Sequence, residues 1–148
     1  MRILIIEDDM NKSSKIESFL KKEIPNITID TASSYNSGLK KILLDKFNLI
    51  LLDMTMPTFD KTPSSHGGKL IRYAGKEILG QMKRKKIHTP TIVITQYATF
   101  GEEDNMKSFD EMKKELFKEY DQFLVSMIYF EPDKADWEMN IIKLIRNG

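Results

Sequence analysis

Three continuous apolar runs of the chain each end in side chains that can do chemistry. Glu7 and Asp8 follow the first run, Asp53 follows the second, and Thr95 closes the third. If these groups lie together, the carboxylates repel one another and raise one another's pKa values unless a cation lies among them. A divalent ion with oxygen ligands, Mg²⁺ above all, is the natural occupant. An aspartate beside Mg²⁺ can act as a nucleophile towards a phosphoryl group, and a hydroxyl can hold a transferred phosphoryl oxygen.

The apolar runs are too short for helices and suit strands that are buried on both faces of a parallel sheet. They cover Ile3–Ile6, Leu49–Leu52 and Thr91–Ile94. An alternating segment, Ile27–Thr31, is typical of an edge strand, and Phe123–Phe130 is expected to be the fifth strand. Helical spacing of apolar residues appears after every strand, so the order is strand–helix repeated five times. This order predicts an α/β protein with a parallel sheet covered on both sides.

We expect a flavodoxin-like, doubly wound, three-layer sandwich whose five strands have the order 2-1-3-4-5. In this order the first, third and fourth strands are neighbours, and their carboxyl ends meet in one crevice. The predicted inner faces of the helices are formed by these apolar residues: Ile16, Phe19 and Leu20; Leu39, Ile42 and Leu43; Ile71, Ala74, Ile78, Leu79 and Met82; Met106, Phe109, Met112, Leu116 and Phe117; and Trp137, Ile141, Leu144 and Ile145. The last helix is expected to start at Pro132-Asp133, and Ser33 or Ser34 to cap the second.

The composition indicates a single domain, because 148 residues are enough for one core and no linker or repeat divides them. A formal net charge of +1 gives no general attraction to nucleic acid, and we expect none to bind directly. The chain has no cysteine, which excludes disulfides and thiolate chemistry. The N-terminal apolar run is too short for a signal peptide, and no stretch approaches the ~20 apolar residues of a membrane span. We therefore expect a cytoplasmic protein that does not contact a membrane.

Taken together, the three motifs resemble the receiver domain of two-component response regulators, in the CheY-like superfamily. ILIIEDD is similar to the acidic motif of its first strand, LILLDMTMP to its phosphoacceptor strand, and TIVIT to its hydroxyl-bearing fourth strand. The resemblance implies that Asp53 is the phosphoacceptor and Thr95 the switch hydroxyl. It also implies that Mg²⁺ is bound by Glu7, Asp8, Asp53 and the backbone carbonyl of Thr55.

The family resemblance also carries expectations about partners. A histidine kinase or a phosphotransfer protein would donate the phosphoryl group, and a separate effector protein would read the result. Phosphorylation reshapes the face built from the fourth helix and fifth strand in this family, where Tyr129 is the expected switch aromatic. By this resemblance the chain is not an enzyme, and its own chemistry is limited to self-catalysed phosphotransfer and dephosphorylation.

The predicted site departs from the receiver pattern at two positions. Receivers carry a lysine followed by a proline at the end of the fifth strand, and the best match places Glu131 at the lysine position. A different register would place Ser126 there, which also lacks the positive charge. An anion beside a phosphoryl group removes a charge-assisted contact and adds a repulsive one. Gln96 stands where the family has a small residue. The candidates to replace the missing lysine are Lys134, Lys61 and Lys69.

Two segments are longer than the receiver norm. Turn-forming residues fill the loop 58–68, directly after Pro57. Receivers have a glycine at the start of the third helix, and Gly75 resembles it, so the first insertion covers roughly 59–74. The second insertion covers the region 97–120. Both would lie beside the predicted site and the predicted output face, where the loop 58–68 either covers the pocket or binds a partner.

Two interpretations of function follow from the resemblance. In the first, the chain is a stand-alone receiver in a phosphorelay: it ends at Gly148, just after the last helix, so any output would lie in another protein. In the second, it is a pseudo-receiver that is never phosphorylated and acts as a protein-interaction module, which Glu131 and Gln96 favour. A phosphohydrolase of the haloacid dehalogenase type is disfavoured, because Thr55 stands where that family needs a second aspartate.

Two short stretches carry charges of one sign. The basic run Lys83–Lys86 is interpreted as a solvated helix end, because cations favour the negative end of a helix dipole. The acidic stretch Glu102–Asp104 supports that interpretation, with self-association of the two stretches in a homodimer as the alternative.

Overall fold

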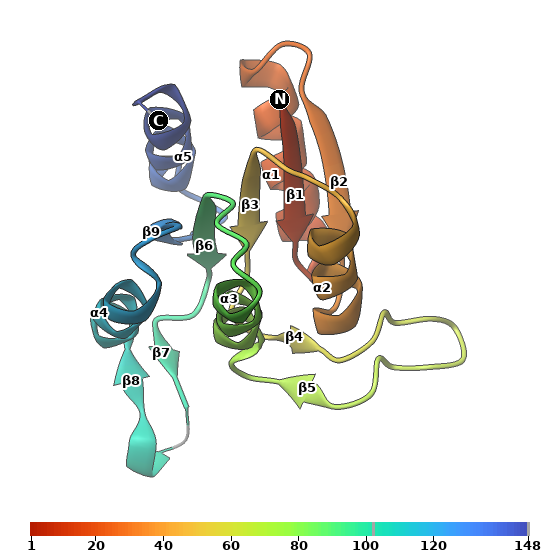
Figure 1. Ribbon diagram of the computed structural model, residues 1–148, viewed down its shortest axis with the longest axis vertical. Helices are drawn as coiled ribbons and strands as arrows, with labels where there is room; N and C mark the ends of the chain where they lie inside the picture. The colour runs from red at the N-terminus through yellow and green to blue at the C-terminus, as the bar shows by residue number, and fades with distance from the viewer. Residues whose placement is uncertain (102, 148) are drawn as a thin grey trace.

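The computed structural model describes residues 1–101 and 103–147. Its centre is a five-stranded parallel sheet with the order β2-β1-β3-β6-β9 (Figure 1). The strands are β1 (Arg2–Ile6), β2 (Thr28–Ala32), β3 (Leu49–Leu52), β6 (Thr91–Thr95) and β9 (Leu124–Tyr129). The order confirms the predicted flavodoxin-like arrangement. Both β3 and β6 are buried along their whole length, as their unbroken apolar sequences predict.

Five helices cover the two faces of the sheet. Apolar side chains of α1 (Met10–Glu23) and α5 (Asp136–Asn147) share one buried cluster with Ile3, Ile5 and the matching side of the other strands. The opposite cluster contains side chains of α2, α3 and α4. These helices span Tyr35–Leu44, Ala74–Arg84 and Phe109–Tyr120. The three-layer sandwich is thus confirmed.

Side-chain caps fix where two of the helices next to the sheet begin. The Asp9 carboxylate accepts hydrogen bonds from the backbone amides of Asn11 at 2.9 Å and Lys12 at 3.2 Å, so α1 starts directly after the end of β1. Ser34 forms a capping box with Ser37 at the start of α2, in agreement with the predicted cap. The early start of α1 places its first turn beside the carboxyl ends of the strands.

Two short hairpins extend from the sandwich. The first pairs β4 (Met56–Pro57) with β5 (Leu70–Ile71) and closes the loop 58–68, which projects away from the sheet in Figure 1. The second pairs β7 (Thr99–Phe100) with β8 (Lys107–Ser108), and a 3₁₀ turn, Glu103–Asn105, precedes β8.

The two hairpins and the start of the last helix correct sequence-based predictions. Ile71 pairs in β5 and is not part of α3. Met106 is exposed and precedes β8, so it is not on the inner face of a helix. The last helix begins at Asp136, four residues after Pro132. Glu102 of the predicted acidic stretch lies outside the described residues, as does Gly148. Among the described residues, none of the helices combines the length and apolarity that crossing a bilayer requires.

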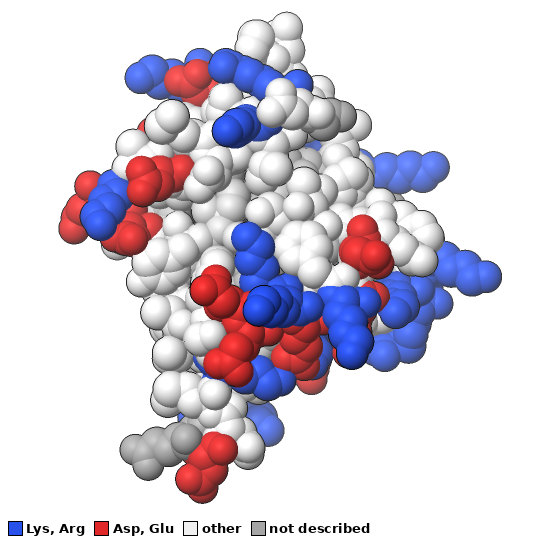
Figure 2. All heavy atoms as spheres, turned by 90° about the vertical axis from the view of Figure 1, so that its left-hand side faces the viewer, with Lys and Arg blue, Asp and Glu red and all other residues white. Residues whose placement is uncertain are grey.

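An ion-pair network ties the second hairpin to two helices. Glu115 on α4 accepts hydrogen bonds from the ammonium groups of Lys107 in β8 at 2.5 Å and Lys76 in α3 at 2.6 Å. The Lys107 hydrogen bond, with Lys76 adding to it, lowers the pKa of Glu115 below its ordinary value. Figure 2 shows acidic and basic side chains lying next to one another on the side of the molecule that includes α4.

We expect Glu115→Gln to lower the free energy of unfolding slightly near neutral pH. A carboxyl whose pKa is lowered by folding stabilises the protein above its ordinary pKa, and this contribution is lost as the pH falls through the folded-state pKa. The difference from the wild type should therefore shrink below about pH 4. Because the three side chains are partly exposed, salt should weaken the effect. Urea unfolding at neutral and acid pH, at low and high salt, measures it; an equal difference under all conditions would contradict the prediction.

Candidate functional site

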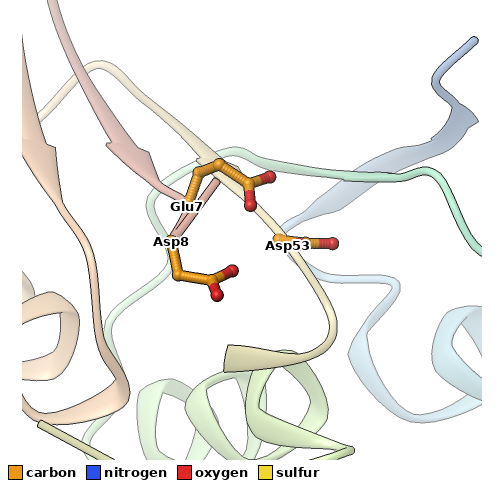
Figure 3. Close-up of side chains that lie close together, drawn as sticks. All are labelled: Glu7, Asp8 and Asp53. Carbon is orange, nitrogen blue, oxygen red and sulfur yellow. The ribbon is translucent and has the colours of Figure 1, made fainter. Parts of the chain in front are cut away.

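Three carboxylates meet at the carboxyl ends of β1 and β3. Glu7 and Asp8 directly follow β1, and Asp53 directly follows β3 (Figure 3). One oxygen of each lies within 4.8 Å of the others. Strand pairing brings them together, since Ile6 pairs with Leu52 in the parallel register. The structure thus places these three predicted residues in one cluster.

Asp53 is held firmly at the end of β3. Its backbone amide donates to the Ile6 carbonyl at 3.0 Å, which extends the β1–β3 pairing by one residue. Its Oδ1 accepts a hydrogen bond from the Met54 amide at 2.8 Å, and the residue is only 3% exposed. Helix α3 lies close behind, because the Gly75 amide donates to the Met54 carbonyl at 2.9 Å. The carboxylate is therefore fixed in orientation.

A buried lysine that was not among the predicted site residues lies within the cluster. Lys12, in the first turn of α1, is 2% exposed. Its Nζ lies 2.5 Å from Glu7 Oε1 and 3.3 Å from Asp53 Oδ1, and it donates to the Ile94 carbonyl at 2.7 Å. An ammonium has three N–H donors, and three acceptors surround this one. Lys12 thus joins the ends of β1, β3 and β6.

Burial and mutual repulsion raise the pKa values of the acids. Burial raises the pKa of Glu7 to about 8, with the Asp53 charge adding to the shift and the Lys12 ammonium opposing it. Burial also raises the pKa of the half-buried Asp8, again with the Asp53 charge adding to it. One ammonium therefore does not compensate three carboxylates, and the cluster favours a further positive charge.

The donor set fits a magnesium ion. With every group ionised, the three carboxylates and one ammonium carry a formal charge of −2, which a divalent cation would neutralise. A bound cation would also favour the ionised forms of the acids. Carboxylate oxygens are the ligands that Mg²⁺ prefers. Glu7 Oε1 is buried, and among the described residues its one cationic neighbour is the Lys12 ammonium, so it retains a lone pair for a cation. Asp8 is the more accessible acid of the β1 pair and faces the same space (Figure 3).

The sequence model of the response regulator receiver domain matches residues 3–122. This chain belongs to the response regulator receiver domain family. Among its relatives, the Detocs response regulatory protein DtcB of Enterobacter cloacae (strain JD6301) is 31% identical over 147 residues, which cover 98% of this chain and 98% of DtcB.

Solved structures agree with this fold. A receiver domain of a Francisella response regulator superposes with a TM-score of 0.66 at 18% identity and covers 99% of this chain and 97% of its own. The response regulator TrrA of Thermotoga maritima, in complex with Mg²⁺ and BeF, gives a TM-score of 0.60 at 19% identity, over 97% of each chain. Receiver domains act in phosphorelay signalling with kinases and effectors and bind Mg²⁺ at an acidic pocket, and the acidic cluster of this receiver lies at the corresponding strand ends.

Two threonines of the receiver were also predicted at the site. Thr95 is fully buried at the end of β6, beside the acidic cluster's strands, and its hydroxyl oxygen accepts a hydrogen bond from the Tyr97 amide at 3.2 Å. The Thr55 hydroxyl points elsewhere and donates to the Arg72 carbonyl at 2.8 Å. A metal contact through the Thr55 backbone carbonyl stays a prediction, as does the switch role of Thr95.

Two aromatic residues lie near the predicted switch. Tyr97 is 45% exposed. The buried part of its side chain, together with the negative charge of Asp53, raises the pKa of its hydroxyl, which therefore lies in the electric field of the cluster. Tyr129 is exposed on β9 and contacts Phe109 of α4 edge-on, with ring centroids 6.0 Å apart. Its position between β9 and α4 suits a switch aromatic, a role that stays a prediction.

The end of β9 supplies no cation to the site. Phe130 follows the strand, is 1% exposed, and donates its backbone amide to the Thr95 carbonyl at 2.8 Å. Its ring packs on Trp137 of α5 with centroids 4.9 Å apart. Glu131 is half-exposed and pairs with Lys134 at 3.2 Å. Of the three lysines considered from the sequence, Lys134 is thus engaged with Glu131, and the other two are exposed in the first hairpin.

Proposed function

We propose that this receiver is a stand-alone, Mg²⁺-dependent phosphoacceptor that carries the phosphoryl group on Asp53 and changes its protein contacts as a result. The observation that carries this proposal is the cluster of three carboxylates within 4.8 Å at the strand ends, with Asp53 fixed among them. The proposed switch hydroxyl is Thr95, which closes the neighbouring strand β6.

The chemistry assigned to Asp53 is a nucleophilic displacement at phosphorus. The Met54 amide and the Lys12 ammonium both approach Oδ1, so we assign the attack to Oδ2. A new O–P bond forms as the P–N bond to the donor histidine breaks. The electron pair of the broken bond returns to the imidazole, which takes up a proton from solvent. Hydrolysis reverses the state when water attacks phosphorus and the Asp53 carboxylate leaves.

The proposed magnesium ligands are Glu7, Asp8, Asp53 and the Thr55 backbone carbonyl. When bound, Mg²⁺ would neutralise charge that develops on the transferring phosphoryl oxygens. The three carboxylates carry more negative charge than the Lys12 ammonium balances, which favours binding of a divalent cation. TrrA, a protein of the same fold, forms a complex with Mg²⁺ and BeF.

Partners are proposed by analogy with the family. A histidine kinase or phosphotransfer protein would be the donor, and a separate protein the effector. DtcB is matched over 98% of its own length, which supports an arrangement with the output in another protein. We further propose that the chain acts on no separate substrate and catalyses only its own phosphorylation and dephosphorylation.

The direct test is the intact mass after incubation with acetyl phosphate and Mg²⁺. The wild type should gain one phosphoryl group, and Asp53→Asn should gain none, because the amide is not a nucleophile. Asp133→Asn, an exposed aspartate outside the cluster, is the matched control and should react like the wild type. EDTA should suppress the adduct. Absence of an adduct on folded wild-type protein, or its persistence on Asp53→Asn, would overturn the proposal.

A phosphorylation-independent interaction module is the second candidate. It is favoured by the ion pairs of Lys12, which partly neutralise the cluster without any metal, and by Glu131 at the position of the receiver lysine. In that case the folded wild type takes up no phosphoryl group and binds its partner equally well with or without acetyl phosphate.

A further inference from the structure

The cation expected from the end of β9 is missing, yet a buried ammonium occupies the site. It comes from the opposite end of the sequence, from the first turn of α1, where the Asp9 cap fixes the helix start. Lys12 is four residues before Ile16 and eight before Leu20, so it lies on the buried stripe of the helix. Its side chain therefore enters the molecule rather than the solvent.

The aromatic residue that follows β9 helps to position this ammonium. Lys12 Nζ lies 5.7 Å from the centroid of the Phe130 ring, within the range of a cation–π contact. Phe130 is in turn fixed by its backbone hydrogen bond to Thr95 and by Trp137. The end of β9 thus contributes a support for the lysine, while Glu131 turns outward to Lys134.

We propose that Lys12 supplies the ammonium that binds the phosphoryl group on Asp53, in place of a lysine at the end of the fifth strand. This inference rests on the proposed phosphoacceptor function. Nζ already lies 3.3 Å from Asp53 Oδ1, so an oxygen of a phosphoryl group on that carboxylate comes within its reach. Phosphorylation exchanges the contact with Oδ1 for one with a phosphoryl oxygen that carries more negative charge, while the contacts with Glu7 and Ile94 hold the ammonium in place.

The test compares Lys12→Met with Lys15→Met, which removes an exposed lysine from the same helix. Two quantities are measured: the rate of adduct formation with acetyl phosphate and Mg²⁺, and the Mg²⁺ affinity by calorimetry. Loss of a charge-assisted hydrogen bond should slow the adduct of Lys12→Met by about 10- to 100-fold. Mg²⁺ should bind Lys12→Met more tightly than the wild type, because a neighbouring positive charge has gone. Lys15→Met should change neither quantity.

The opposite directions of the two effects separate this role from a structural one, since a disturbed cluster would weaken both. A double variant, Lys12→Met with Glu131→Lys, provides the rescue. It places a lysine at the position, just after β9, where other receivers carry one, and it should recover most of the lost rate of adduct formation. If Lys12→Met reacts as fast as the wild type, or if Mg²⁺ affinity falls together with the rate and the double variant recovers nothing, the Lys12 role is wrong. If the wild type itself forms no adduct, the proposed function fails and this inference with it.

Discussion

Replacing Lys12 with methionine should lower the free energy of unfolding by about 3–5 kcal/mol in magnesium-free buffer, because removing one partner of a buried ion pair leaves the other charges uncompensated. Methionine fills a similar volume, so the loss reports the charge rather than a cavity. Glu7 and Asp53 are 4% and 3% exposed, and both lose their nearest cation. The pKa of Glu7, which burial already raises, should rise further, because Lys12 opposes that rise.

Magnesium should reverse much of this loss. A ligand that binds only the folded state stabilises it by an amount that grows with the logarithm of its affinity, and Lys12→Met is expected to bind Mg²⁺ more tightly than the wild type. Urea unfolding in EDTA and in excess Mg²⁺ measures both effects. Lys15→Met, the exposed neighbour on α1, should stay within about 0.5 kcal/mol of the wild type in both buffers. Equal stability of Lys12→Met and the wild type in EDTA would show that the ion pairs do not hold the cluster together.

The sheet and its acidic edge could be predicted from sequence because their signals are local. Unbroken apolar runs occur in buried parallel strands, and the residue after each run falls at the carboxyl edge of the sheet. The order of the strands then follows from the doubly wound fold that the strand–helix alternation predicts. Asp53 and the Glu7–Asp8 pair therefore lie where expected. The two-residue strands of the hairpins carry no periodic pattern, which is why Ile71 and Met106 were placed on helices.

Lys12 was missed because a lysine in the first turn of a helix is usually solvated. Two signals in the sequence point to it in retrospect. It falls on the same helical stripe as Ile16 and Leu20, and Glu131 leaves the receiver site without its usual cation. Neither signal identifies a contact by itself, since the pairing of Lys12 with Asp53 joins residues 41 positions apart in the chain. Tertiary packing decided which lysine fills the site.

The start of α3 offers a second large effect, through a glycine that contacts the phosphoacceptor backbone. A Cβ on Gly75 would lie 2.6 Å from the Asp53 carbonyl oxygen and 3.0 Å from the Met54 Cα. Both neighbours are backbone atoms at the buried end of β3, so they cannot move aside as a flexible side chain would. The close approach of α3 to the site therefore requires glycine at this position.

We expect Gly75→Ala to lower the free energy of unfolding by about 1–3 kcal/mol, the usual cost of overpacking. It should also slow phosphorylation, because relief of the contact displaces Asp53 from its hydrogen bond with Met54. Gly80→Ala in the same helix is the matched control: its Cβ would meet only the Tyr120 hydroxyl at 3.4 Å and the Arg84 side chain. There alanine should stabilise the protein by about 0.5–1 kcal/mol through helix propensity and leave the rate of adduct formation unchanged. Urea unfolding and intact-mass kinetics on both variants distinguish the two sites. If Gly75→Ala and Gly80→Ala change the free energy of unfolding and the rate of adduct formation equally, α3 can move away from β3 at Gly75 without disturbing the Asp53 backbone, and the prediction is wrong.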